Sequence, residues 1–158
     1  MSDARQLLRH TLATVAYRGG KAIRNAPAEF AAFKNSETTR TPLEILAHIG
    51  DLYDWALSIA RGAEKWNSAT PLPWEQESKR FFAGVQALDQ YLASGETLHE
   101  TPEKLFQGPI ADSLTHIGQL TMLRRMASSP IRGESYHKAD IVAGRTGPDQ
   151  APPRREFD

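Results

Sequence analysis

Apolar side chains recur every three or four positions along four stretches of the chain, the spacing that predicts amphipathic α-helices. The stretches cover about residues 3–24, 41–62, 74–94 and 108–129. The expected buried positions are, in chain order, Leu8, Leu12, Val15, Gly19 and Ala22; Ile45, Ile49, Leu52, Ala56 and Ile59; Phe81, Val85, Leu88 and Leu92; and Leu114, Ile117, Leu120, Leu123 and Met126. We therefore expect an all-α fold, a four-helix bundle with a long connection between its second and third helices.

Short-range signals mark where these helices begin and end. Thr41 and Glu44 flank Pro42 in the pattern of a capping box, with proline where its missing N–H is harmless. Gly95 is expected to end the third helix. We expect one short turn in AEFAAFK and one in the linker ETLHETPEKLFQG. The single strand-like candidate is ADIVAG, near the end of the chain.

The composition changes near the C-terminus, where glycine, proline and scattered charges become frequent from Gly133 onward. We therefore divide the chain into a bundle domain, residues 1–130, and a C-terminal tail, residues 131–158. Two interpretations of the tail stay open. It is an irregular extension, or it is an ordered strap packed over the bundle, because it carries apolar side chains to bury: Tyr136, Ile141, Val142 and Phe157.

Composition and charge exclude several classes of function. The 158 residues suit one domain, and 19 basic residues balance 19 acidic ones. With no net charge to attract polyanions, we expect neither a nucleic-acid nor a membrane partner. The absence of cysteine excludes disulfides and thiolate ligands. No signal-peptide pattern and no apolar run of about 18 residues is present, so we expect a cytoplasmic protein.

Three side chains that can bind a metal fall on the predicted core-facing sides of two helices. His48 lies in line with Ile45 and Leu52, and Asp112 and His116 lie one helical turn apart. Burial of an imidazole or a carboxylate without a partner costs several kcal/mol. A divalent cation would satisfy all three groups, and two histidines with one carboxylate leave coordination positions open. Zinc, nickel and iron(II) all fit such a ligand set.

Simpler interpretations of these residues also stand. An inward histidine is commonly a hydrogen-bonded core residue, and Asp112 could interact with the helix dipole in its first turn. Asp51, one turn after His48, is expected to be solvated, with a hydrogen bond to a metal ligand as the alternative. His137 would add a ligand if the tail covered the bundle mouth.

The remaining conspicuous side chains are expected to have structural roles. We expect core positions for the aromatic residues of the second and third helices and surface positions for two histidines. We expect an arginine pair to lie on a solvated face or at the edge of an interface. These residues are Tyr53, Trp55 and Trp74; His10 and His99; and Arg124 and Arg125.

The run LTHIGQLTMLRRMASSPIRGESY resembles the last bundle helix of the DinB/YfiT-like family of metal-dependent proteins. In many members this helix reads His-x-x-x-His followed by Arg-Gly-Gln. The second histidine matches His116, and Ile117-Gly118-Gln119 replaces Arg-Gly-Gln. Asp112 stands where the first histidine would fall. TPLEILAHIGDLYDWAL is similar to the second helix of the family and places the remaining ligand at His48. The resemblance covers about residues 3–130.

This resemblance implies a function as well as a fold. Family members with assigned activities include metal-dependent thiol transferases and thiol-dependent isomerases. It implies an enzyme of the transferase or hydrolase type, with a divalent metal at His48, Asp112 and His116 and a low-molecular-weight thiol as substrate. It also implies a homodimer. The alternative is a non-catalytic, stress-related protein that binds a metal or a small molecule in the same pocket.

Overall fold

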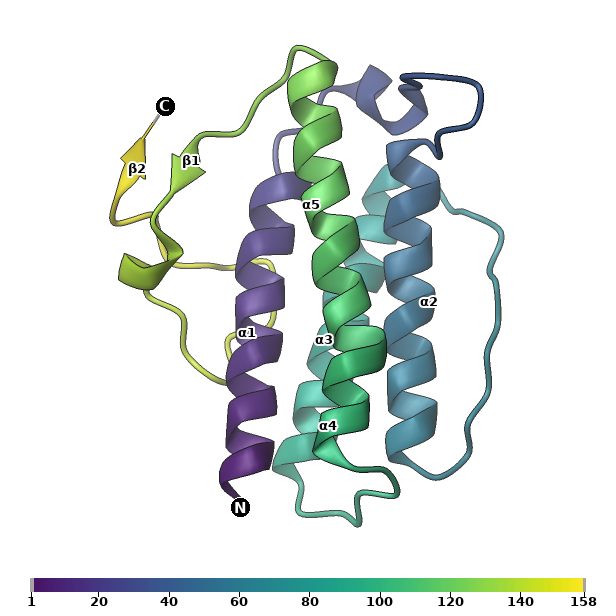
Figure 1. Cartoon of the computed structure of the whole chain (residues 1–158), viewed down its shortest axis with the longest axis vertical. Helices are drawn as coiled ribbons and strands as arrows, with labels where there is room; N and C mark the ends of the chain where they lie inside the picture. Colours follow the sequence, from purple (N-terminus) through teal and green to yellow (C-terminus); the bar gives the residue numbers. More distant parts are fainter. Residues whose placement is uncertain (1, 158) are drawn as a thin grey trace.

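Four long helices form a bundle in the computed structural model, which describes residues 2–157. They are α1 (Asp3–Ile23), α2 (Pro42–Ala60), α3 (Trp74–Ala93) and α5 (Ala111–Met126). Helices α1 and α5 run in one direction, whereas α2 and α3 run in the other (Figure 1). Since α3 starts at the same end of the bundle as α2, the connection over residues 61–73 returns along the length of α2. The expected all-α class is confirmed.

The helix ends follow the local signals. The hydroxyl of Thr41 accepts from the Glu44 amide (3.2 Å), and the Glu44 carboxylate accepts from the Thr41 amide (2.7 Å), which completes the capping box. Gly95 follows α3 with a φ of +81°, a conformation that favours glycine. The two predicted short turns are a 3₁₀ helix, η1 (Ala28–Ala32), and one turn of α-helix, α4 (Pro102–Leu105).

The fourth predicted helix begins earlier than the sequence indicates. A π-helical turn, η2 (Phe106–Ile110), joins α4 to α5, so helical backbone is already present before Gly108 and Pro109. Gly108 has a non-helical ψ of −106°, and the wide turn accommodates the proline, which has no N–H to donate. Proline was expected to begin the helix, whereas here it lies inside a bulge.

The buried positions agree with the predicted stripes, with three exceptions. Every predicted position of α1 and α3 is buried. Ile59 and Leu114 are half-buried, and Met126 is 47% exposed. Met126 lies in the last turn of α5, where it borders a shallow pocket shared with Phe30 and Phe33 instead of facing a bundle helix. Tyr53 is fully buried as expected, whereas Trp55 and Trp74 are half-buried.

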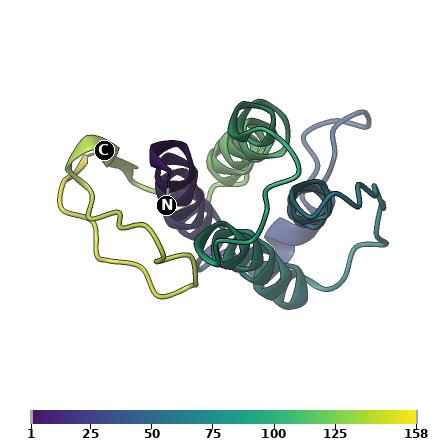
Figure 2. The same cartoon turned by 90° about the horizontal axis from the view of Figure 1, so that it is seen from below.

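The tail is an ordered strap on α1. It contains η3 (Tyr136–Lys138) and two short antiparallel strands, β1 (Gly133–Glu134) and β2 (Glu156–Phe157). ADIVAG, the single strand-like candidate, forms no strand. The strap lies on the outer side of α1, and residues 61–73 lie beyond α2 on the opposite side of the bundle (Figures 1 and 2).

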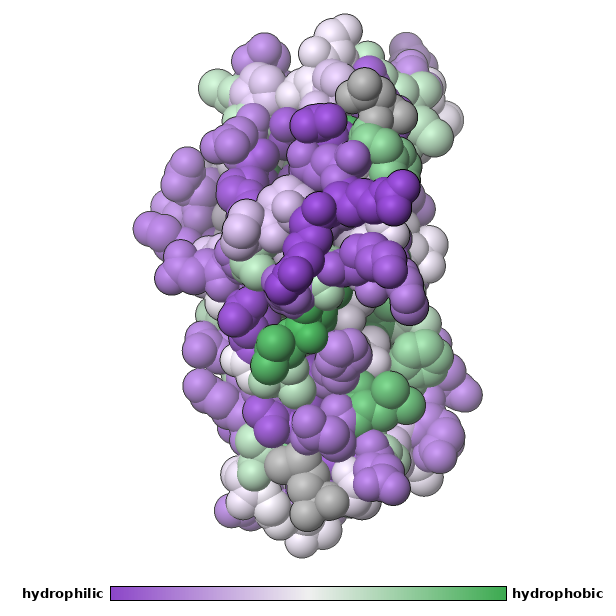
Figure 3. Space-filling view, turned by 90° about the vertical axis from the view of Figure 1, so that its left-hand side faces the viewer, coloured by the Kyte–Doolittle hydropathy of each residue, from purple (hydrophilic) through white to green (hydrophobic). Residues whose placement is uncertain are grey.

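Buried charge anchors the strap. Glu134 accepts hydrogen bonds from the Tyr17 hydroxyl (2.5 Å) and from Nζ of Lys21 (2.8 Å), and Lys21 also pairs with Glu156 (2.8 Å). Among the apolar anchors proposed from the sequence, Val142 and Phe157 are more than half exposed. Tyr136 does pack, edge-on to the Tyr17 ring and beneath the guanidinium of Arg18. The outer surface on this side is largely hydrophilic (Figure 3).

Arg124 corrects another expectation. It is 4% exposed, and its guanidinium donates to the carbonyl oxygens of Ala22 and Arg24 at the end of α1. The last carbonyls of a helix have no partner within it, so a cation from α5 is favourable there. The expected solvated face holds only for Arg125, which is exposed. None of the described helices combines the length and apolar character needed to cross a bilayer.

Candidate metal centre

The three predicted ligands meet between α2 and α5, which pack against each other. His48 lies in the second turn of α2, and Asp112 and His116 lie one turn apart on α5. One donor atom from each side chain can be chosen so that all three atoms lie within 4.8 Å of one another. Among the residues that the structure describes, these three form the group of side chains that can hold a metal ion.

The carboxylate of Asp112 lies between the two imidazoles. Its Oδ2 is 3.7 Å from Nε2 of His48, and its Oδ1 is 3.4 Å from Nε2 of His116. A tetrahedral cation with ligand distances of about 2.0–2.2 Å separates neighbouring donor atoms by roughly 3.3–3.6 Å. The two distances involve different oxygens of Asp112, and each is close to the separation of neighbouring ligands around one cation. Because no backbone amide of the described chain donates to Asp112, this carboxylate is not a helix cap.

Gln119 orients one of the imidazoles. Its carboxamide oxygen lies 2.8 Å from Nδ1 of His116. A carboxamide oxygen can only accept, so Nδ1 carries the proton and Nε2 keeps its lone pair for a metal. This contact was missed in the sequence analysis, although the spacing of three residues on one helix indicates that the two side chains are neighbours.

His48 has an environment that favours its neutral form. Its pKa is lowered chiefly by burial, then by His116 and Arg40, against the opposing effect of Asp112. The ring lies nearly perpendicular to that of His116, with 4.7 Å between centroids. A neutral imidazole is the form that binds a metal.

The long connection between α2 and α3 contributes an aromatic side chain to the centre. Trp66 packs its ring 5.7 Å from that of His48 and 5.7 Å from that of Trp55. Trp66 itself is 45% exposed. The connection therefore borders the centre on the α2 side.

Buried carboxylates hold this connection in place. Asp51 accepts from the amide of Ala69, and Glu77 accepts from the amide of Leu72. Both carboxylates also accept from the guanidinium of Arg80. The expectation that Asp51 is solvated is therefore wrong, because its side chain is only 6% exposed and forms an ion pair with Arg80 of α3.

The centre is open on one side. The side chains of His48 and His116 are 23% and 12% exposed, whereas that of Asp112 is 46% exposed. The sequence predicted that all three would point into the bundle interior. The structure instead leaves Asp112, in the first turn of α5, half exposed where α2 and α5 pack together, with only the two histidines mostly covered. Solvent or a small molecule can therefore approach from the Asp112 side.

The other histidines lie away from this centre. His137 is exposed in η3, where it borders a pocket with Lys138 and Arg154, so the alternative of a ligand from the tail is wrong. The strap that carries it lies on the side of α1 that faces away from α2 (Figure 2). His10 and His99 are exposed, as expected.

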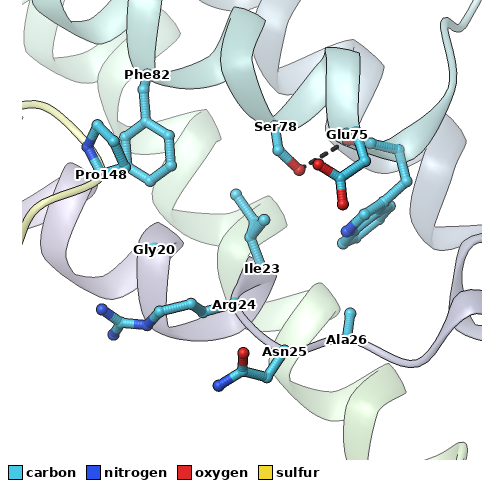
Figure 4. A pocket seen from close by; sticks show the side chains of 10 residues that line it. Gly20, Ile23, Arg24, Asn25, Ala26, Glu75, Ser78, Phe82 and Pro148 are labelled. Atoms are coloured by element: carbon cyan, nitrogen blue, oxygen red, sulfur yellow. Dashed lines mark hydrogen bonds between the residues drawn. The ribbon is translucent and has the colours of Figure 1, made fainter.

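A separate pocket of about 340 Å³ lies where α1 ends and α3 begins (Figure 4). Its apolar side includes Ile23, Phe82 and Pro148, and Glu75 supplies its carboxylate. The Ser78 hydroxyl is already committed to the carbonyl of Trp74 (2.8 Å). With no histidine and one carboxylate, this pocket lacks the donors for a transition metal.

No protein-family model, curated protein or solved structure matches this chain.

Proposed function

We propose that the chain is a DinB/YfiT-like, metal-dependent protein that holds one divalent cation through His48, Asp112 and His116. The observation that carries this proposal is the convergence of the three donor groups from α2 and α5. The return of residues 61–73 along the bundle supports the same family, since the resemblance implies a long connection at this point. Zinc, nickel and iron(II) are the candidate metals, because two imidazoles and one carboxylate suit all three.

The proposed activity is the transfer or hydrolysis of small molecules, with a low-molecular-weight thiol as the transferase substrate. A cation bound here would lower the pKa of a thiol or a water molecule that reached the open side. Asp112 supplies one negative charge and the two neutral histidines supply none, so a site with a divalent ion keeps a net positive charge. That charge favours an anionic sulfur or oxygen on the exposed flank.

The test begins with the metal alone. We would produce the chain without a histidine tag, remove bound metal, and titrate it with zinc, with cobalt(II) as a spectroscopic probe. The expected result is one equivalent of metal per chain. At a free metal concentration of 100 times Kd, binding should stabilise the fold by about 2.7 kcal/mol. For a chain of this length that raises Tm by roughly 5–10 °C.

Two histidine variants make the result specific. His116→Ala should stay folded and lose both stoichiometric binding and the metal-induced rise in Tm. His10→Ala removes an exposed histidine of α1 and should behave like the unmodified chain. The proposal fails if zinc, nickel and iron(II) all leave Tm and the cobalt spectrum of the unmodified chain unchanged.

A turnover screen separates an enzyme from a binding protein. The metal-loaded chain would be incubated with small thiols and electrophiles, and the disappearance of the thiol measured. Turnover that is lost in His116→Ala supports the transferase proposal. A chain that binds metal stoichiometrically but turns over none of these substrates favours the non-catalytic, stress-related alternative. The proposed homodimer is tested in the same preparations by light scattering.

A further inference from the structure

A pocket of about 480 Å³ opens beside the proposed metal centre, between residues 39–40 and α5. His116 lines this pocket and also points Nε2 toward the carboxylate of Asp112. One imidazole is therefore shared between the two sites. The pocket and the proposed metal centre are therefore immediate neighbours, separated by the ring of His116.

Most of the pocket surface is hydrocarbon. Ile45 and Leu123 are nearly fully buried and form its floor, whereas Met122 is 58% exposed at its edge. Methionine adapts its shape to different apolar ligands, and an exposed methionine beside a pocket is well suited to that role. The pocket therefore favours a ligand with a short apolar segment.

One cationic side chain lines the pocket. Arg40 is exposed, and its guanidinium makes no hydrogen bond or ion pair within residues 2–157. Glu44, four positions after it, already accepts a hydrogen bond from the amide of Thr41. The charge of Arg40 also acts on Glu44 and His48, but its N–H groups remain able to donate to a ligand. A guanidinium fits a carboxylate with two parallel hydrogen bonds.

We propose that this pocket selects ligands with a metal-binding group at one end, a short apolar chain, and a carboxylate that pairs with Arg40 at the other. Thiol carboxylates are the simplest members of this class. The inference rests on the proposed metal site and adds the part of the ligand that the chain recognises.

The test compares two thiol probes of equal length on the cobalt-loaded chain. Mercaptohexanoate carries the carboxylate, and mercaptohexanol replaces it with a neutral hydroxyl. Binding is followed by the sulfur-to-cobalt absorption band and by calorimetry. Mercaptohexanoate should bind roughly five- to ten-fold more tightly, which is less than a buried hydrogen bond to a charged group provides, because Arg40 is exposed.

Variants assign that preference to one residue. Arg40→Gln should abolish the preference while the chain still binds one equivalent of cobalt. Lys79→Gln removes the same charge from an exposed position on α3 and should retain the preference. Met122→Trp should fill the pocket and weaken both probes.

The possible failures are distinguishable. If cobalt binds but the two probes bind equally, or if the preference survives in Arg40→Gln, the inference about the pocket is overturned and the metal site stands. If cobalt does not bind at all, both proposals fail.

Discussion

Replacing Arg80 with methionine should destabilise this protein much more than removing a surface charge does. The guanidinium donates to Asp51 (2.5 Å), Asp54 (2.7 Å) and Glu77 (3.3 Å). The side chains of Asp51 and Glu77 are 6% and 0% exposed, and that of Asp54 is 60% exposed. Burial opposes the charge on Arg80, but the hydrogen bonds to Asp51 and Asp54 outweigh it and raise the pKa of Arg80.

The magnitude follows from what the substitution leaves behind. Removing one partner of a buried ion pair costs about 3–5 kcal/mol, because the other charge stays buried. The loss of an exposed partner such as Asp54 adds only about 0–1 kcal/mol. Since Arg80 is itself 20% exposed, water can partly replace it, and we expect a loss of about 3 kcal/mol. For this chain length that lowers Tm by roughly 6–12 °C.

The assay is urea unfolding at neutral pH, followed by both tryptophan fluorescence and far-UV circular dichroism. Lys79→Met, on the exposed side of the same helix, should change stability by less than about 0.5 kcal/mol. Adding Glu77→Gln to Arg80→Met should recover part of the loss, because it removes a buried charge and keeps an acceptor for the amide of Leu72. An Arg80→Met variant within about 1 kcal/mol of the unmodified chain would show that water reaches both carboxylates, and would refute the reasoning.

Three further predictions concern the packing and the strap. Gly19→Ala should lower the free energy of unfolding in urea by about 1–3 kcal/mol, because the new Cβ would lie 2.5 Å from the buried ring of Phe81. Gly118→Ala should instead raise it by about 0.5–1 kcal/mol, because the new Cβ on α5 meets no atom within 4 Å. A loss in both variants would contradict this assignment. Lys21→Met leaves the carboxylate of Glu134 buried without its positively charged partner. The variant should therefore be cleaved faster than the unmodified protein within residues 131–157, while α1 stays protected. Equal cleavage rates in the variant and the unmodified protein would count against the strap. The hydrogen bond from Lys21 lowers the pKa of Glu156. This contact therefore stabilises the strap fully above the ordinary carboxyl pKa, and the stabilisation is lost as the pH falls through the lowered pKa of Glu156. Hydrogen exchange of the tail amides, corrected for its intrinsic rate, should therefore increase below about pH 4, and pH-independent protection would argue against the contact.

Expectations about charged residues failed where their partners lie far away in the sequence. Asp51 and Arg124 were expected to be solvated because most charged side chains are. Asp51 instead pairs with Arg80, 29 positions later, and Arg124 binds the carbonyl of Ala22, 102 positions earlier. Nothing within a few residues of either one indicates such a partner. The interpretation of the tail as an ordered strap likewise relied on its apolar residues, yet the buried side chain that anchors it is that of Glu134.

The sequence by itself determined the features that depend on neighbours along one helix. These are the four helices and most of their buried faces, the capping box at Thr41, and the alignment of Asp112 with His116. Each follows from the 3.6-residue period, because residues three or four apart share one face. The contact between Gln119 and His116 belongs to the same class and could have been predicted.

Only the tertiary structure decided which faces meet. The approach of His48 to the pair on α5, the packing of Trp66 beside it and the place of the strap on α1 all depend on how whole helices pack. Helical periodicity specifies that a face is buried but not its partner, because many pairings of four amphipathic helices bury similar apolar area. The exposure of the candidate ligands also depends on this packing, since the way α5 packs on α2 leaves the side chain of Asp112 half exposed.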